Sequence, residues 1–230
     1  MYKICYLFLL YLMYAFLGWV VEVVNSYIQH KRFINRGFMI GPYCPIYGTG
    51  VLLIIFLLKD YTDNYLVLFI LSMTVCMVVE YLTSLVMELL FNARWWDYSN
   101  RKFNINGRVC LETAIPFGLC GMLIMYVINP IFVKLLDKGS EKFIIILGII
   151  LMILFFTDLI VSFLVVLKYR KAGVENYKDD TEEMNKKVHD YLVSHSYLTK
   201  RFAESFPNAK LKVEKFKKLY EKRKKEIMKK

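Results

Sequence analysis

Long apolar runs constrain the fold of this chain more than any other feature of its sequence. They recur along the first 168 residues, as in the stretches from Ile4 to Val24 and from Phe143 to Leu167. A helix rises about 1.5 Å per residue, so about 20 residues cross the hydrocarbon core of a membrane. The chain is 57% hydrophobic, against roughly 45–50% in an average soluble protein. The sequence therefore predicts an all-α integral membrane protein.

About five transmembrane helices are expected, and the second is irregular. Their approximate ranges are 4–24, 45–58, 65–91, 109–136 and 143–167. As a helix, the second range reaches only about 21 Å, so the missing length must come from the stretch GFMIGPYC before it, which is predicted to be non-helical. Pro116 and Pro130 should kink the fourth span. The N-terminal run is long for a signal peptide and no small-residue cleavage site follows it, so a retained span is expected.

The charge pattern divides the chain into a transmembrane domain, residues 1–168, and a basic cytoplasmic helical tail, residues 169–230. Most of the net charge of +11 lies in the tail. Because the charge is not spread over a soluble fold, we expect no nucleic-acid partner. Asp180 or Thr181 is a candidate N-cap of a first tail helix, and Pro207 separates it from a second.

The second tail helix is predicted to be basic and amphipathic. Its apolar stripe consists of Leu211, Phe216, Leu219, Tyr220 and Ile227. Such a helix can lie on anionic lipid or pack on a protein partner. A solvated, partly ordered tail is the alternative interpretation.

The distribution of Lys and Arg predicts the orientation of the chain in the cell membrane. These residues cluster after the first span, after the third span and in the tail, and they are sparse on the opposite side. The positive-inside rule then places the N-terminus outside and the C-terminus in the cytoplasm. With five spans, every loop lies on the side of the membrane that its charge predicts. The basic tail would meet the anionic lipids of the cytoplasmic leaflet.

Four glutamates gather at the cytoplasmic side in this topology. Glu22 ends the first span, Glu88 ends the third and Glu112 begins the fourth. Glu80 lies two turns deeper than Glu88 on the same helix face as Ser84. Such positions are consistent with isolated structural ion pairs or hydrogen bonds, but four together favour a shared site.

A counter-ion or a proton is needed for the deepest of these carboxylates. An ionised carboxylate at the bilayer centre costs about 2.5–3.5 kcal/mol. Glu80 should therefore face protein or water, and either pair with Arg36 or Arg108 or take up a proton. We expect the four glutamates to converge with Arg36 on one cavity, floored by residues 37–48.

Two cytoplasmic loops supply the remaining candidates for a substrate or gating cavity. The first, FINRGFMIGPYCPIYGTG, mixes glycine, proline and aromatic residues; its candidates are Asn35, Arg36, Gly37, Pro42, Pro45 and Tyr47. Non-helical backbone at membrane depth persists only where protein or water satisfies it, and an interrupted span is typical of transport sites. The alternative is that its glycines only permit close helix packing.

The second loop, RWWDYSNRKFNINGR, combines aromatic and polar residues. Its candidates are Trp96, Asp97, Tyr98, Asn106 and Gly107. Aromatic side chains here also suit the membrane interface, which is the alternative interpretation of the tryptophans.

Motifs of common enzymes are missing from the sequence. It contains no phosphate-binding G-x-x-x-x-G-K-[ST] loop, no H-E-x-x-H and no G-x-S-x-G. The three histidines lie outside the expected spans, and the five cysteines form no C-x-x-C pair. We therefore expect no metal site and no cofactor, and an enzyme is the less favoured class.

Five segments resemble one family of bacterial membrane proteins: FLGWVVEV, FINRGFMIGPYCPIYGTG, EYLTSLVMELLF, RWWDYS and NINGRVCLE. The family is the putative ABC-transporter type IV family, also labelled as an ABC transporter permease. The resemblance covers about the first 140 residues, and span five and the tail look like an extension. It implies a permease and no particular substrate.

Three functional hypotheses follow. In the first, the chain is a permease-like component that moves an unknown substrate, and a separate ATPase subunit acts on the loop 95–106. In the second, it is a membrane enzyme or lipid-handling protein in which Asp97, Glu88 and Glu112 hold Mg²⁺, a cation that prefers oxygen ligands. In the third, it is a regulatory membrane protein whose tail recruits partners.

Overall fold

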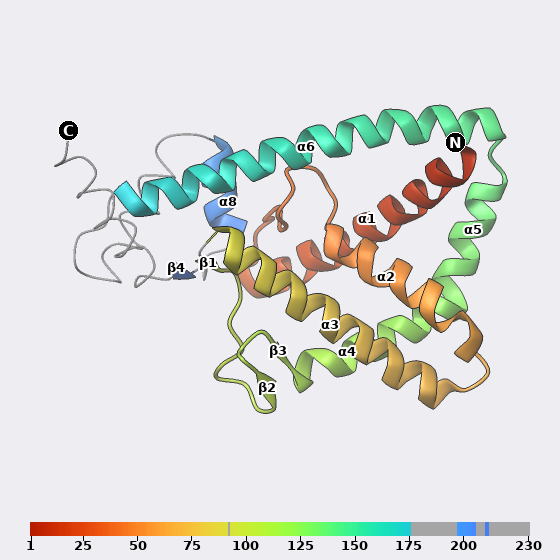
Figure 1. Cartoon of the computed structure of the whole chain (residues 1–230), viewed down its shortest axis with the longest axis horizontal. Helices are drawn as coiled ribbons and strands as arrows, with labels where there is room; N and C mark the ends of the chain where they lie inside the picture. Colours follow the sequence, from red (N-terminus) through yellow and green to blue (C-terminus); the bar gives the residue numbers. More distant parts are fainter. Residues whose placement is uncertain (92, 176–196, 206–209, 212–230) are drawn as a thin grey trace.

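The computed structural model describes residues 1–91, 93–175, 197–205 and 210–211 (Figure 1). The helical elements are α1 (Tyr2–His30), α2 (Pro45–Leu58), η1 (Lys59–Tyr61), α3 (Tyr65–Phe91), α4 (Leu111–Leu123), the π-helical turn η2 (Ile124–Ile128), α5 (Asn129–Asp137), α6 (Glu141–Glu175) and α8 (Tyr197–Ser205). The strands are β1 (Ala93–Arg94), β2 (Asn104–Ile105), β3 (Val109–Cys110) and β4 (Lys210–Leu211). The predicted predominance of helix is confirmed.

Four of the described helical segments are long and apolar enough to cross a membrane. They are Tyr2–His30, Tyr65–Phe91, Leu111–Asp137 and Glu141–Leu167. These match the first, third, fourth and fifth predicted spans. The predicted second span contains only the 14-residue helix α2, which is shorter than the roughly 20 residues that a crossing needs. The described part of the chain therefore has four full-length spans and one short apolar helix.

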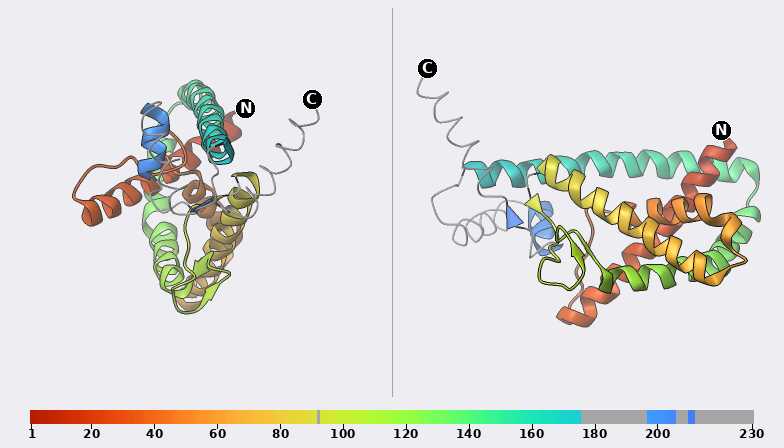
Figure 2. Two further views of the ribbon diagram at one scale, coloured as in Figure 1. Left: turned by 90° about the vertical axis from the view of Figure 1, so that its left-hand side faces the viewer. Right: turned by 60° about the horizontal axis from the view of Figure 1, so that its bottom comes forward.

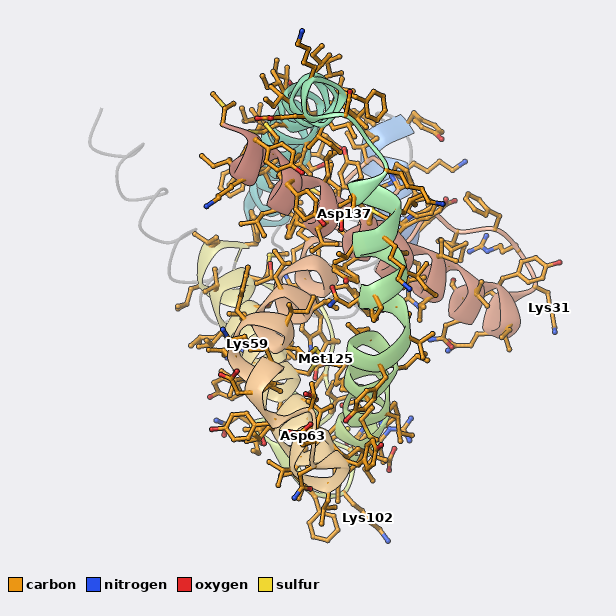
Figure 3. The ribbon with its side chains drawn as sticks, turned by 90° about the vertical axis from the view of Figure 1, so that its right-hand side faces the viewer. Lys31, Lys59, Asp63, Lys102, Met125 and Asp137 are labelled. Atoms are coloured by element: carbon orange, nitrogen blue, oxygen red, sulfur yellow. The ribbon has the colours of Figure 1, made fainter. Side chains whose placement is uncertain are left out.

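The helices run between two ends of the molecule (Figures 1 and 2). One end holds the N-terminus, the connection from α2 to α3 and the connection from α5 to α6; the other holds the strands, α8 and the C-terminal part of α1. Figure 3 looks from the first end and labels Lys59, Asp63 and Asp137 there. The loops with most positive charge, 31–44 and 92–110, thus share the opposite end.

The segment before α2 is non-helical, as predicted, and it reaches the middle of α1. The backbone N–H of Cys44 donates a hydrogen bond to the carbonyl oxygen of Ala15 at 2.9 Å. Pro45 then begins α2. Proline lacks a backbone N–H, but at the first position of a helix that N–H would have no partner within the helix. Gly37 has a φ of 131°, which only glycine adopts without strain. Helix α2 therefore starts half-way along α1.

The fourth span is broken near Pro130, as expected. The π-helical turn η2 separates α4 from α5, and Pro130 is at the start of α5. Proline has no N–H to donate, and its ring clashes with the carbonyl four residues earlier, here that of Tyr126. The wider π turn accommodates this conflict. Pro116, in contrast, lies inside α4.

One apolar core joins α1 to α2, α5 and α6. Cys5, Leu10 and Tyr14 of α1 pack with Val51 and Ile144 in this cluster. Large apolar side chains also point outward, and Ile146, Ile153 and Ile160 of α6 are each at least 60% exposed. Residues of this kind on the outside of a helix bundle are in contact with lipid when the protein is in a bilayer.

The described part of the tail differs from the prediction at one residue. Leu211, expected in a basic helix, belongs to β4, which pairs with β1 so that Leu211 lies opposite Ala93. The reason is that α3 ends at Phe91, which frees the backbone after it for strand pairing. The expected caps Asp180 and Thr181 and the rest of the predicted second tail helix, residues 212–230, lie outside the described residues.

Candidate functional site

Helix α3 has one polar face directed into the protein. Glu80, Ser84 and Glu88 are 8%, 4% and 6% exposed, so the expected common face of these three residues is confirmed. Two turns separate the two glutamates along the helix, and their surroundings differ. They are described in turn as the outer group around Glu88 and the inner group around Glu80.

The outer group is an ion-paired cluster. Arg108 lies 2.8 Å from Oε2 of Glu88 and donates a hydrogen bond to Ser84 Oγ at 3.1 Å. Arg94 also approaches Glu88 Oε2, at 3.5 Å. The guanidinium of Arg108 is stacked above the ring of Tyr81 at 5.6 Å, and the residue is only 7% exposed. The charge of Glu88 is therefore compensated inside the protein.

A hairpin after α3 brings Arg108 to this position. Strands β2 and β3 pair antiparallel with Ile105 opposite Val109, and Gly107 in the turn has a φ of 65°. The indole N–H of Trp96 donates to the carbonyl of Arg108 at 3.0 Å, and the amide of Asn106 donates to the Tyr81 hydroxyl at 3.0 Å. Asn106 thus fastens the loop to α3, and Trp96 and Gly107 fix the shape of the loop itself.

Asp97 stabilises the turn that begins this loop. Its Oδ1 accepts hydrogen bonds from the hydroxyl of Ser99 at 2.6 Å and the amide of Ser99 at 3.0 Å, and Arg94 lies 3.2 Å away. The hydrogen bond from the Ser99 side chain and the charge of Arg94 lower the pKa of Asp97. Asp97 is thus an ionised residue of a surface turn.

The inner group joins two carboxylates and two tyrosines. The hydroxyl of Tyr47 donates to Glu22 Oε1 at 2.8 Å, and that of Tyr98 donates to Glu80 Oε1 at 3.3 Å. Glu22 and Glu80 are close enough to interact electrostatically. Oε2 of Glu80 is buried without a hydrogen-bond partner. Among the described residues, the ion pairs of the structure reach neither Glu22 nor Glu80.

Close contact between α1 and α2 positions the Glu22 half of the inner group. Gly18 of α1 faces the ring of Tyr47, and a Cβ at Gly18 would overlap that ring. Glycine therefore lets the tyrosine lie flat against α1, with its hydroxyl at Glu22 one turn further along. This explains why an apolar span contains a glycine before its terminal glutamate.

Loop 31–44 is held by side chains from three helices. Trp19 of α1 donates to Asn35 Oδ1 at 2.7 Å, and the amide of Asn35 donates to the carbonyl of Ile40 at 2.9 Å. Asp158 of α6 accepts from the backbone N–H of Ile40 at 3.0 Å and that of Gly41 at 2.7 Å. These contacts satisfy backbone groups that no helix or strand satisfies.

Two of the residues that hold this loop escaped the sequence analysis. Asp158, which also accepts from the Tyr43 hydroxyl at 2.7 Å, is an acidic residue inside an apolar run, and that position is itself a signal. Arg201 of α8 donates to the carbonyls of Gly37 and Met39. The lysine-rich sequence around Arg201 contains no comparable signal, because it resembles a solvated tail.

In the described part of the chain, neither Arg36 nor Glu112 forms an ion pair with Glu22, Glu80 or Glu88. Glu112 pairs instead with Arg101 at 3.0 Å, and their side chains are 53% and 62% exposed. Of the two arginines expected as counter-ions, Arg108 is brought inward by the hairpin, but it pairs with Glu88 and not with Glu80. Pro42 is exposed, and Pro45 only begins α2.

The three carboxylates proposed to hold Mg²⁺ have different partners. Glu88 pairs with Arg108, Asp97 with Arg94 and Glu112 with Arg101. In the part of the chain that the structure describes, no group of three or more His, Cys, Asp or Glu residues is arranged to hold a metal ion. The Mg²⁺ form of the enzyme hypothesis is therefore not supported by this geometry.

A family model described as putative ABC-transporter type IV matches residues 9–163. The chain belongs to this family. The match begins in α1 and extends well into α6, so the fifth predicted span is largely part of the family region and not an extension of it. Comparisons with curated proteins and with solved structures found no match. Both the inner and the outer group lie within the matched residues of this transport-related membrane protein family.

Proposed function

We propose that the chain is a permease-like component of a transporter, and that the inner group lines its substrate or gating region. The observation that supports this most is the position of the buried Glu80 and the half-buried Glu22 beside a helix that begins half-way along α1. Discontinuous helices at this depth are typical of transport sites. Polar residues in membrane spans also commonly mark ion or substrate pathways.

The loop 95–106 is well placed to connect an ATPase with the inner group. Tyr98 belongs to this loop and contacts Glu80 directly. Phe103, near the tip of the loop, is 80% exposed and has a φ of 51°, so its aromatic ring is available to a partner. A subunit that pushes on Phe103 would displace Tyr98 from Glu80. Since this chain lacks a phosphate-binding loop, we propose that a separate subunit binds the ATP.

Co-purification tests this proposal. The tagged full-length chain is extracted from its native membranes in mild detergent, and co-purifying ATP-binding subunits are identified and assayed for ATP hydrolysis. We expect a stoichiometric subunit that is lost with Phe103→Ser. Phe33→Ser, a change of the same kind at a 67% exposed residue in the other loop, should retain it. Mg²⁺-dependent turnover of a lipid by the isolated chain would instead favour an enzyme.

The proposed orientation is N-terminus outside and C-terminus in the cytoplasm, with α2 and loop 31–44 together completing a fifth crossing. In a chain without native cysteines, cysteines at Asp63 and Gly139 should react with an impermeant thiol reagent in intact cells. Cysteines at Asn100 and Asn185 should not. Labelling of Asn100 from outside would reverse the orientation. We further propose that the basic tail binds anionic lipid on the cytoplasmic face.

A further inference from the structure

The inner group contains more negative charge than its surroundings compensate. Glu22 and Glu80 interact electrostatically, and the latter is only 8% exposed. Each carboxylate accepts one tyrosine hydroxyl. The two like charges repel each other, and burial adds a desolvation cost for Glu80. Among the described residues, no ion pair supplies Glu80 with a positive charge.

Among the described residues, no cation pairs with Glu80. The titratable groups that interact with it are Glu22 of α1, Tyr47 of α2, Cys76 of α3 and Tyr98 of the following loop. These groups are neutral or negative and never positive. Arg36 and Arg201 interact with Cys44, which also interacts with Glu22, and Arg108 already contacts Glu88 and Ser84. A bound cation could therefore compensate the charge of Glu80.

The coordination chemistry favours the smallest cation. Mg²⁺ requires six oxygen ligands and Ca²⁺ six to eight, whereas this group has two carboxylates and two hydroxyls. Both hydroxyls already direct their hydrogen atoms at the carboxylates. The unpartnered Oε2 of Glu80 can accept one proton without rearrangement. A like charge nearby and burial both favour the protonated form of a carboxyl group.

We propose that Glu80 is a proton-binding site, in which the buried, unpartnered Oε2 takes up one proton. The part that this site would play in transport rests on the function proposed above; the binding of the proton does not. Protonation needs no co-reactant, because the proton comes from water and joins an existing lone pair. Tyr98 connects this site to loop 95–106, because a hydroxyl that donates to a carboxylate stabilises its ionised form.

The contact between Tyr98 and Glu80 predicts how a movement of the loop changes the proton affinity of the site. When the loop holds Tyr98 against Glu80, the ionised carboxylate is favoured and the proton is released. When the loop moves away, the carboxylate loses its donor and binds the proton more tightly. Movement of loop 95–106 would therefore switch the proton affinity of Glu80 between a lower and a higher value.

Infrared difference spectroscopy on the full-length protein in lipid nanodiscs tests the proposal without an ATPase or a substrate. Spectra collected across a pH titration report the carbonyl band of protonated carboxyl groups. We expect a buried carboxyl band that Glu80→Gln removes and that Tyr98→Phe retains with its midpoint at higher pH. Glu112→Gln, at an exposed ion-paired residue, should leave the band unchanged. Size-exclusion chromatography confirms that each variant is folded.

Three outcomes would overturn the proposal. One is a wild-type spectrum with no buried carboxyl transition, and another is a transition that survives Glu80→Gln. The third is a transition that sodium abolishes at constant pH, which would show a metal-ion site. If the expected band is found but no ATP-binding subunit co-purifies, the proton site stands and the permease role fails. If a subunit co-purifies without the band, the reverse holds.

Discussion

The outer and inner groups lie two turns apart on α3, yet the glutamate in each group has different partners. Glu88 is 6% exposed and meets Arg108 at 2.8 Å and Arg94 at 3.5 Å. Glu80 is 8% exposed and meets a tyrosine hydroxyl, with one oxygen unpartnered. Two equally buried carboxylates on one helix therefore differ in whether a cation compensates their charge.

The difference also predicts unequal contributions of the two residues to stability. A carboxylate with a buried guanidinium partner holds elements together, and its removal leaves the arginine uncompensated. A buried carboxylate without a cation has a desolvation cost that one tyrosine hydroxyl offsets only in part. The role proposed above for the inner group would give Glu80 a use other than holding the fold.

The largest effect is expected for Arg108→Met. Removing one partner of a buried ion pair costs about 3–5 kcal/mol, because the buried Glu88 loses the guanidinium 2.8 Å away and Arg94 lies further off, at 3.5 Å. Reversible unfolding of the purified protein in micelles measures this loss. Arg101→Met breaks an exposed pair and should cost less than about 1 kcal/mol. Equal losses in the two variants would show that the outer group is not a structural ion pair.

A smaller loss of stability is expected for Ser84→Ala. Its hydroxyl accepts a hydrogen bond from Arg108 at 3.1 Å, and hydrogen bonds to charged groups contribute about 1.5–3 kcal/mol. Ser72→Ala on the same helix is the matched control, since Ser72 Oγ is equally buried but has no hydrogen-bond partner. The same unfolding assay should show no loss for Ser72→Ala. A loss of similar size there would attribute the effect to packing.

A third, comparable loss should follow Gly18→Ala. The new Cβ overlaps the ring of Tyr47, and overpacking costs about 1–3 kcal/mol. It should also displace the hydroxyl from Glu22 and so disturb the inner group. Gly50→Ala meets nothing within 4 Å and should be neutral or stabilise α2 by up to about 1 kcal/mol. Thermal unfolding of the two variants in parallel distinguishes a general effect of alanine from this contact.

The smallest effect on stability is expected for Glu80→Gln, at less than about 1 kcal/mol, because glutamine still accepts from Tyr98 and no cation is orphaned. The same change should abolish most of the ATP hydrolysis or transport of the assembled complex. Glu88→Gln should show the opposite pattern, losing stability first because Arg108 loses its charged partner. If Glu80→Gln destabilises as much as Glu88→Gln and leaves activity intact, the distinction between the two groups is wrong.

Sequence reasoning identified the components of both groups but not their pairing. The spacing of Glu80, Ser84 and Glu88 correctly predicted one buried face, because a helix repeats its direction every 3.6 residues. Arg36 and Arg108 were both candidates for the counter-ion of Glu80, and Arg108 pairs with Glu88 instead. Asp158 was missed although its isolation in an apolar run was visible. The sequence shows the periodicity of a single helix, but it does not show which distant segments come into contact.

The sequence by itself determined that this chain is a helical membrane protein, where its four long apolar helices lie, and that the approach to α2 is non-helical. Those properties follow from hydrophobic length, proline and glycine, which act over a few residues at a time. Only the tertiary structure decided which carboxylate obtains a cation. The hairpin of β2 and β3 folds back by 20 residues to bring Arg108 to Glu88, whereas Glu80, two turns deeper, meets a neutral tyrosine. Whether a charge is compensated depends on distances of a few ångströms, because electrostatic energy falls with distance in space. The separation of two residues along the sequence does not give that distance.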